Sequence, residues 1–209
     1  MKKTFLLLLS LYLNIALAVE DGFDYQSVTP PVPVQNQTSG RVEVVEMFWY
    51  GCPHCLHFEP VINNWARQKP SNVDFFRIPA IFRDSWESLA RAFYTAEALG
   101  VLDRIHPALF KAIQEQRRKL DTAQEIRTFF AEHGVPSSDF DQVFNSFGIE
   151  TKIRRAKDLT RRYGIDGVPA VIVQGKYRTN GTLTGGLENV PPVIDALIQR
   201  ELGTPTKKD

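Results

Sequence analysis

The sequence contains very little cysteine and histidine. Only two of its 209 residues are cysteines, Cys52 and Cys55, and only four are histidines. A closed zinc site takes four ligands, commonly as two pairs from separate segments, and the chain has no second C-x-x-C and no H-x-x-x-H pair. Leu56 follows Cys55, so the C-x-x-C-H haem-attachment pattern is missing as well. We therefore expect no metal and no haem.

The chain also lacks an excess of charge of either sign. Its 25 Lys and Arg residues oppose 24 Asp and Glu residues, which gives a net charge of +1. A nucleic-acid partner is not expected on this balance. The most basic stretch, "KIRRAKDLTRR" at 152–162, has an acid among its bases, which favours a solvated helix face. The sequence also shows no internal repeat and no low-complexity region.

A long apolar run is missing too, although a short one occupies the N-terminus. Lys2 and Lys3 precede the apolar stretch 5–13, and Ala16-Leu17-Ala18 has the small-x-small pattern of a signal-peptidase site. The apolar stretch is too short for the ~20 residues that span a bilayer. We predict a cleaved signal peptide at 1–18 and a soluble, exported mature chain. Its cleavage removes two lysines and leaves 23 bases against 24 acids.

Strand and helix patterns occur at both ends of the mature chain. Nearly continuous apolarity predicts a buried central strand at 41–50, and Pro53 suits the first turn of a helix. The expected elements are a strand at 41–50, a helix at 53–68, a strand at 73–82, a hairpin at 169–180 with its turn at 174–176, and a helix from Asn189.

About five helices are expected between these elements. Apolar residues recur there at helical spacing, and Thr122 with Glu125 has the spacing of a capping box. The last two of these helices are predicted at 137–147 and 151–163. The fold class is therefore α/β with an inserted all-helical domain. The predicted divisions are a leader at 19–40, an α/β domain at 41–83 and 164–203, a helical insertion at 84–163 and a tail at 204–209.

The two cysteines form a C-x-x-C pair, for which three interpretations exist. As a structural staple, a four-residue loop would contribute roughly 2 kcal/mol, against about 3 kcal/mol for a 15-residue loop. A metal site lacks further ligands, as described above. A redox disulfide fits better, because Cys52 begins a helix whose free N–H groups and dipole favour a thiolate. The staple and the metal site remain as weaker alternatives.

The residues between the cysteines fit the redox interpretation. Pro53 keeps the first helical turn rigid, and a protonated His54 would add positive charge beside Cys52. Cys55, one turn further along, is expected to face the core. A stabilised Cys52 thiolate favours the reduced protein, which makes the disulfide form a strong oxidant.

At this point the sequence resembles the DsbA family of exported thiol oxidases, over essentially the whole mature chain. The resemblance rests on the C-P-H-C motif, on "GVPAVIV" at 167–173, on Pro60 within the first helix and on the helical insertion. It implies a thioredoxin fold with an inserted all-helical domain, and a cis bond before Pro169. It also implies that Val168 pairs through its backbone with an extended substrate chain.

Further implications of the resemblance concern partners and location. It implies a monomeric periplasmic oxidase that donates its Cys52–Cys55 disulfide to unfolded exported proteins with free thiols. A DsbB-like membrane protein linked to quinone would reoxidise it, and no dissociable cofactor is implied.

Three charged residues are further candidates. Glu46 shares a face of the central strand with Val44 and Phe48, so burial should raise the pKa of its carboxyl. Glu59 lies one helical turn past Cys55, and Arg77 lies in the second strand. The resemblance implies a small charged cluster that tunes the site or handles protons, with lysine in the family where this chain has Arg77. An arginine cannot be expected to lose its proton.

Two other functions remain open at this level. A disulfide isomerase or reductase could use the same fold, although known exported isomerases carry a dimerisation domain for which 19–40 is too short. Val168, where threonine would be expected in such an enzyme, also favours the oxidase. A non-catalytic chaperone or peptide-binding module is the second alternative, and it would keep its activity without Cys52.

Overall fold

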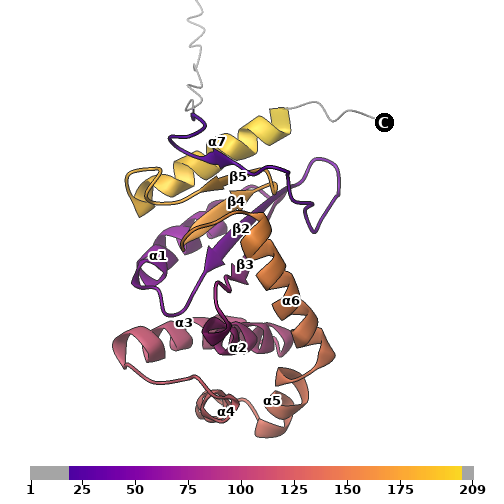
Figure 1. Ribbon diagram of the computed structural model, residues 1–209, viewed down its shortest axis with the longest axis vertical. Helices are drawn as coiled ribbons and strands as arrows, with labels where there is room; N and C mark the ends of the chain where they lie inside the picture. The colour runs from indigo at the N-terminus through magenta and orange to yellow at the C-terminus, as the bar shows by residue number, and fades with distance from the viewer. Residues whose placement is uncertain (1–18, 204–209) are drawn as a thin grey trace, which may run out of the picture.

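The structure, a computed structural model, describes residues 19–203. The expected signal peptide at 1–18 and tail at 204–209 lie outside the described residues. The described chain forms a five-stranded sheet in the order β1-β5-β4-β2-β3, with helices on both faces and a group of helices beyond one end (Figure 1). No helix within 19–203 is both long enough and apolar enough to cross a membrane.

Strand β2 is an inner strand of the sheet, between β4 and β3, and every one of its residues is buried. It pairs in parallel with β3 and antiparallel with β4, so it is covered on both edges as its continuous apolarity predicts. The strands are β1 (Gln26–Ser27), β2 (Val42–Phe48), β3 (Val73–Pro79), β4 (Ala170–Val173) and β5 (Tyr177–Thr179). The expected hairpin is confirmed, because β4 and β5 pair antiparallel.

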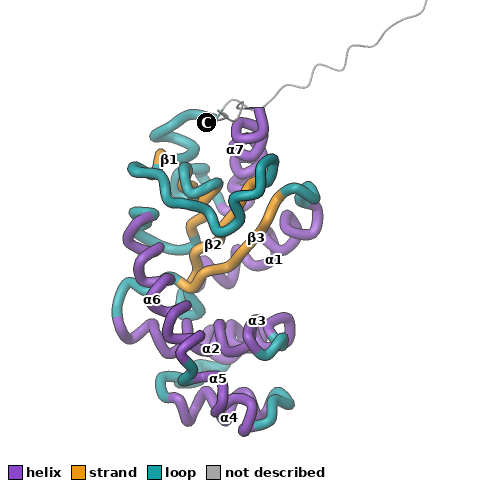
Figure 2. The backbone as a smooth tube through the Cα atoms, turned by 90° about the vertical axis from the view of Figure 1, so that its right-hand side faces the viewer, coloured by secondary structure: helices purple, strands orange, loops and turns teal. Residues whose placement is uncertain are grey.

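Helices α1 (Pro53–Gln68) and α7 (Val190–Gly203) cover one face of the sheet, and Figure 2 shows them on the side of the strands opposite α6. The bounds of α1 match the predicted helix at 53–68. Alternate residues of β2 point to this face. Here a core cluster joins β2 and β4 of the sheet to α1 and α7. Its members include Val44, Val171, Phe58, Ile62, Ile194 and Leu197.

The expected helical insertion is confirmed between β3 and β4. It consists of a short 3₁₀ turn at Asp84–Trp86, α2 (Glu87–Ala98), α3 (Leu102–Phe110), a π turn at Lys111–Glu115, α4 (Ala123–Glu132), α5 (Ser137–Phe144) and α6 (Phe147–Arg162). The last of these helices, α6, runs from the insertion back to the sheet (Figure 1). A second core cluster joins the insertion to the inner strands. The protein therefore has a thioredoxin fold with an inserted all-helical domain.

Capping side chains set the first residues of α4 and α6. The capping box predicted at α4 is present, since Thr122 accepts from the Glu125 N–H and the Glu125 carboxylate accepts from the Thr122 N–H. The predicted division between 137–147 and 151–163 was wrong. The Ser146 side chain accepts a hydrogen bond from the Ile149 N–H, so α6 begins at Phe147.

The segment before β2 contributes more than the sequence suggested. β1 adds an edge strand to β5, and Tyr25, Val28 and Val32 are buried against the domain. Among the described residues, two peptide bonds are cis, Thr29–Pro30 and Val168–Pro169. The second is the one that the family resemblance implies, and the first was not expected.

One buried hydroxyl links the insertion to the end of β3. Thr160 of α6 accepts a hydrogen bond from the Ile81 N–H at 3.1 Å and donates to the Ala156 carbonyl at 2.7 Å. Both bonds are buried, so no water can replace them.

Replacing Thr160 by valine should therefore destabilise the protein. The change keeps the shape of the side chain but leaves the buried Ile81 N–H without a partner, which costs about 1–3 kcal/mol. Thr128→Val is the matched control, because Thr128 makes the same bond to the carbonyl four residues earlier on an exposed face. Denaturant unfolding of both variants checks this prediction. Equal losses of unfolding free energy would contradict it.

Candidate active site

Cys52 occupies the N-cap position of α1, immediately before Pro53 in the first turn. Its backbone is extended, with φ −94° and ψ 116°, and its carbonyl accepts from the N–H groups of Cys55 and Leu56 at 3.1 and 3.3 Å. The Cys52 side chain is half-buried, whereas Cys55 is fully buried, and both are free thiols in this structure. The two sulfurs therefore differ in their access to solvent, as the sequence predicted.

The surroundings of Cys52 stabilise its thiolate. A hydrogen bond from the Cys55 thiol contributes most to lowering the pKa of Cys52 to about 6, against the opposing effect of burial. The backbone N–H groups of Cys55 and His54 contribute next, and the charge of His54 contributes least of these. The helix terminus thus acts as predicted, but His54 is exposed and has a smaller effect than its place in the motif suggested. Burial raises the pKa of Cys55, and its neighbour Cys52 raises it further.

The loop that precedes β4 lies against this thiol. The Cys52 Sγ is 3.2 Å from the carbonyl oxygen of Val168, the residue before the cis peptide bond to Pro169. Residues 116 positions apart in the chain meet here because β4 pairs directly with β2, the strand that leads into the motif. The structure therefore brings together the C-P-H-C motif and the "GVPAVIV" stretch.

A cavity of about 470 Å³ opens beside this contact. It is lined by His54, by the loop at 166–169 and by residues that follow β5, including Asn180, Thr182 and Leu187. These last residues were not among the predicted site residues. Their only sequence signal was a polar, glycine-containing stretch between a strand and a helix.

Two tryptophans stack on one another close to the start of α1. Trp49 stacks on Trp86 of the insertion, with ring centroids 3.9 Å apart and planes 3° from parallel. A Cβ on Gly51 would come within 2.3 Å of the Trp49 ring, so a larger residue at position 51 would displace this ring. The tryptophan stack thus joins the insertion to the segment that enters α1.

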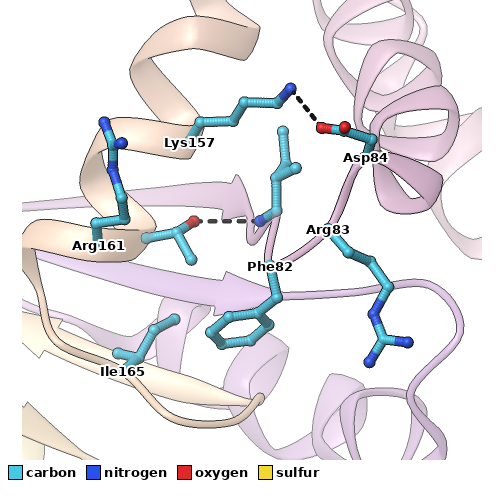
Figure 3. Close-up of a pocket in the computed structure, with 8 residues that line it drawn as sticks. Phe82, Arg83, Asp84, Lys157, Arg161 and Ile165 are labelled. Carbon is cyan, nitrogen blue, oxygen red and sulfur yellow. Dashed lines mark hydrogen bonds and ion pairs between the residues drawn. The ribbon is translucent and has the colours of Figure 1, made fainter.

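Another cavity, of about 320 Å³, lies where α6 meets the end of β3. Ile165 in its lining directly precedes the loop at 166–169. In Figure 3 the Lys157 amine points to the Asp84 carboxylate, while Arg83 points away from Lys157. The Phe82 ring, which is 41 % exposed, gives this cavity an apolar wall. The positive charge of Lys157 is therefore balanced by Asp84, an acid of the insertion.

The three charged residues predicted from the sequence form one cluster beneath α1. Arg77 Nε lies 2.8 Å from Glu46 Oε2, and its Nη2 lies 3.7 Å from Glu59 Oε1. Glu46 is fully buried, and its other oxygen has no hydrogen-bond partner among the described residues. Burial raises the pKa of Glu46 to about 7, with Arg77 opposing and Glu59 reinforcing the shift. The burial predicted for Glu46 is thereby confirmed.

Glu59 behaves in the opposite way. Burial alone would raise the pKa of its carboxyl, but a hydrogen bond from His106, the positive charge of Arg77 and a hydrogen bond from Asn63 lower it. Negative charge on Glu46 contributes to the raised pKa of Cys55, which connects the cluster electrostatically to the buried thiol.

Sequence reasoning missed the members of this cluster that come from elsewhere. His106 on α3 lies 3.2 Å from Glu59 Oε1 and 2.7 Å from the Tyr50 hydroxyl, while the Asn63 carbonyl oxygen accepts from Arg77 at 2.8 Å. A histidine beside an apolar helical stripe was the available signal for His106. Its partner Tyr50 is 56 positions away in the sequence and could not be identified.

No group of three or more His, Cys, Asp and Glu within residues 19–203 is arranged to hold a metal ion. The arrangement instead offers an accessible, acidic thiol, a shielded second thiol, and a loop and a cavity beside them. A dithiol of this kind on a thioredoxin fold defines a thiol:disulfide oxidoreductase.

Comparison with known proteins agrees with this class. A family model described as the DSBA-like thioredoxin domain matches residues 75–188. The thiol:disulfide interchange protein DsbA of Pseudomonas syringae pv. tomato is 42 % identical over 183 residues, which cover 88 % of this chain and 85 % of that protein. The DsbA of Burkholderia cepacia is 40 % identical over 200 residues, which cover 93 % and 94 %.

Solved structures give the same result. The crystal structure of Pseudomonas aeruginosa DsbA has a TM-score of 0.81 at 41 % identity, covering 86 % of this chain and 93 % of that one. The DsbA of Xylella fastidiosa has a TM-score of 0.82 at 31 % identity, covering 89 % and 99 %. The chain belongs to the DsbA family of thiol:disulfide oxidoreductases, and it is a thiol:disulfide oxidase.

The pKa of Cys52 should depend on the donor at position 55. Cys55→Ala removes the thiol that donates to the Cys52 sulfur, so the pKa of Cys52 should rise by at least ~1 unit. Cys55→Ser keeps a donor of similar size and should leave the pKa near the value of about 6. Ultraviolet absorbance of the thiolate, followed against pH in the reduced protein, checks both. Equal midpoints in the two variants would show that position 55 does not set the pKa.

Glu46 should make stability fall as pH rises. The folded protein keeps the Glu46 proton up to about pH 7, whereas the ordinary pKa of the side chain is 4.5. Between these values the folded state binds more protons than the unfolded state, so its contribution to the unfolding free energy is lost as pH rises. Glu46→Gln should therefore show a shallower decline from about pH 5 to 7 in denaturant unfolding. A decline as steep as that of the unaltered protein would contradict this.

Proposed function

We propose that the protein donates a Cys52–Cys55 disulfide to thiol pairs of newly exported, unfolded proteins. The observation that carries this proposal is the asymmetry of the two sulfurs, since Cys52 is half-buried with a pKa of about 6 while Cys55 is buried with a raised pKa. A thiolate that the folded protein stabilises favours the dithiol form, so the disulfide form tends to oxidise its partners.

The reaction proceeds through a mixed disulfide. A substrate thiolate attacks the Cys52 sulfur, the Cys52–Cys55 bond breaks, and Cys55 leaves with the electron pair and takes up a proton. The second substrate thiolate then attacks the substrate sulfur of the mixed disulfide, and Cys52 leaves as a thiolate. The substrate loses two electrons, and the protein gains them as a dithiol. Cys52 leaves readily because its pKa is low.

Glu46 is proposed as the proton donor for Cys55. The leaving Cys55 sulfur has a raised pKa and needs a proton in a buried place. Glu46 is buried in the same region, and a pKa of about 7 lets it give and regain a proton near neutral pH. Glu59 and Arg77 are proposed to tune this group. Arg77 keeps its charge throughout, so it supplies a fixed positive field rather than a proton.

Substrate is proposed to bind across the loop before β4. The backbone of Val168 would pair with an extended chain, which requires no particular substrate sequence. The neighbouring cavity, with His54 and Pro169 in its lining, would receive the side chains that flank the reacting cysteine. Pro53 is proposed to keep the first turn of α1 rigid beneath the attacked sulfur.

We also propose where the protein acts and what reoxidises it. The predicted signal peptide directs the protein to the periplasm, where it acts as a monomer. A DsbB-like membrane protein linked to quinone reoxidises the dithiol, and the disulfide itself is the only redox group. The proposal rests on membership of the DsbA family and on the N-terminal sequence pattern.

The reduction potential distinguishes this proposal from its alternatives. Equilibration with glutathione should give a potential more oxidising than about −200 mV, and the oxidised protein should transfer one disulfide to a dithiol peptide. Cys52→Ala should abolish the transfer, whereas His57→Ala, which changes a histidine of the same helix, should retain it. A potential near the roughly −270 mV of thioredoxin would favour a reductase. Full activity of Cys52→Ala would favour a peptide-binding module.

A further inference from the structure

His106 connects the helical insertion to the redox site. It lies on α3, is only 5 % exposed, and its ring packs edge-on against Phe48 and Phe110. Both ring nitrogens have partners, because Nδ1 is 2.7 Å from the Tyr50 hydroxyl and Nε2 is 3.2 Å from Glu59 Oε1. The orientation of the imidazole is therefore fixed on its faces and at both nitrogens.

These contacts determine which nitrogen carries the proton. An ionised carboxylate only accepts hydrogen bonds, so Nε2 of His106 must donate to Glu59. In a neutral ring Nδ1 then accepts from the Tyr50 hydroxyl. Burial lowers the pKa of His106 in spite of the acidic neighbours Glu59 and Asp103, which is consistent with a neutral ring.

Glu59 is held from three sides. His106 donates to Oε1, Asn63 donates to Oε2 at 2.9 Å, and Arg77 lies 3.7 Å from Oε1. Arg77 also donates to Glu46 at 2.8 Å. One guanidinium is therefore shared by two carboxylates, and the cationic charge available to Glu46 depends on where Glu59 is held.

We propose that His106, supported by Tyr50, is a positioning residue of the redox site that holds ionised Glu59 against Arg77 and so keeps the proton on Glu46 to a higher pH. The charged and titratable groups around this cluster are Glu46 on β2, Tyr50 before α1, Cys55 and Glu59 on α1, Arg77 on β3, and Asp103 on α3. The catalytic meaning of this inference rests on the proton transfer proposed above, but the titration of Glu46 does not.

If Glu59 is no longer held in place, the pKa of Glu46 should fall for either of two reasons. If Glu59 loses a donor, it takes up a proton more easily and its negative charge near Glu46 decreases. If Glu59 swings away, Arg77 interacts with Glu46 alone. Both changes favour the ionised form of Glu46, so its titration midpoint must fall.

The test follows the carboxyl of Glu46 by NMR in protein with ¹³C-labelled glutamate, with its signal assigned by Glu46→Gln. His106→Leu should lower the midpoint by about 0.5–1 pH unit. His106→Gln should restore most of it, because its amide donates to Glu59 and its carbonyl accepts from Tyr50. His133→Leu, the same change elsewhere in the insertion, should leave the midpoint unchanged.

Two further variants separate positioning from loss of packing. Tyr50→Phe keeps the ring and removes only the hydroxyl, so it should shift the midpoint in the same direction by a smaller amount. In a Glu59→Gln background, His106→Leu should have no further effect, since the group through which it acts has lost its charge. An equal shift with and without the Glu59 carboxylate, or no shift in His106→Leu and Tyr50→Phe, would overturn the proposal.

The rate of peptide oxidation tests the connection to catalysis. If the rate profile against pH moves with the Glu46 midpoint in His106→Leu, the positioning role extends to catalysis. If the midpoint moves and the rate profile does not, His106 still positions Glu59, and the proposed proton transfer from Glu46 is wrong instead.

Discussion

The site depends on the stabilisation of negative charge on one sulfur atom. The Cys52 sulfur has the Cys55 thiol and the first N–H groups of α1 as hydrogen-bond donors, and these outweigh the cost of its partial burial. The donors come from the first turn of a helix that already exists, so they need no rearrangement when the thiolate forms. We propose that the other parts of the site receive a substrate chain beside this sulfur or supply the proton that its partner Cys55 needs.

The sheet explains how these parts meet. Because β2 lies between β4 and β3, its end places Cys52 beside the loop that precedes β4, and its buried Glu46 lies beneath α1 next to Arg77 of β3. The insertion interrupts the chain between β3 and β4 without disturbing their pairing with β2. It nevertheless contributes to the site, because α3 carries His106 to Glu59 and Trp86 stacks on Trp49. The insertion is therefore part of the environment of the redox cluster.

Much of this arrangement could be predicted from the sequence, and the exceptions have physical reasons. The strand at Val42–Phe48 and the helix at Pro53–Gln68 follow from continuous apolarity and from a proline in the first turn. The cis bond at Pro169 required the family resemblance, since most X–Pro bonds are trans. The start of α6 was missed because the cap at Ser146, which was not predicted from the sequence, begins the helix at Phe147 rather than at 151. The His106–Tyr50 contact was missed because it joins residues far apart in the chain.

The central claim has a direct thermodynamic test. If the folded protein stabilises the Cys52 thiolate more than the unfolded chain does, the reduced form gains stability that the disulfide form lacks. Denaturant unfolding of the oxidised and reduced proteins at pH 7 compares the two. The account predicts that the reduced protein has the larger unfolding free energy. An oxidised protein that is more stable by about 2–4 kcal/mol, as for an ordinary structural disulfide, would contradict it.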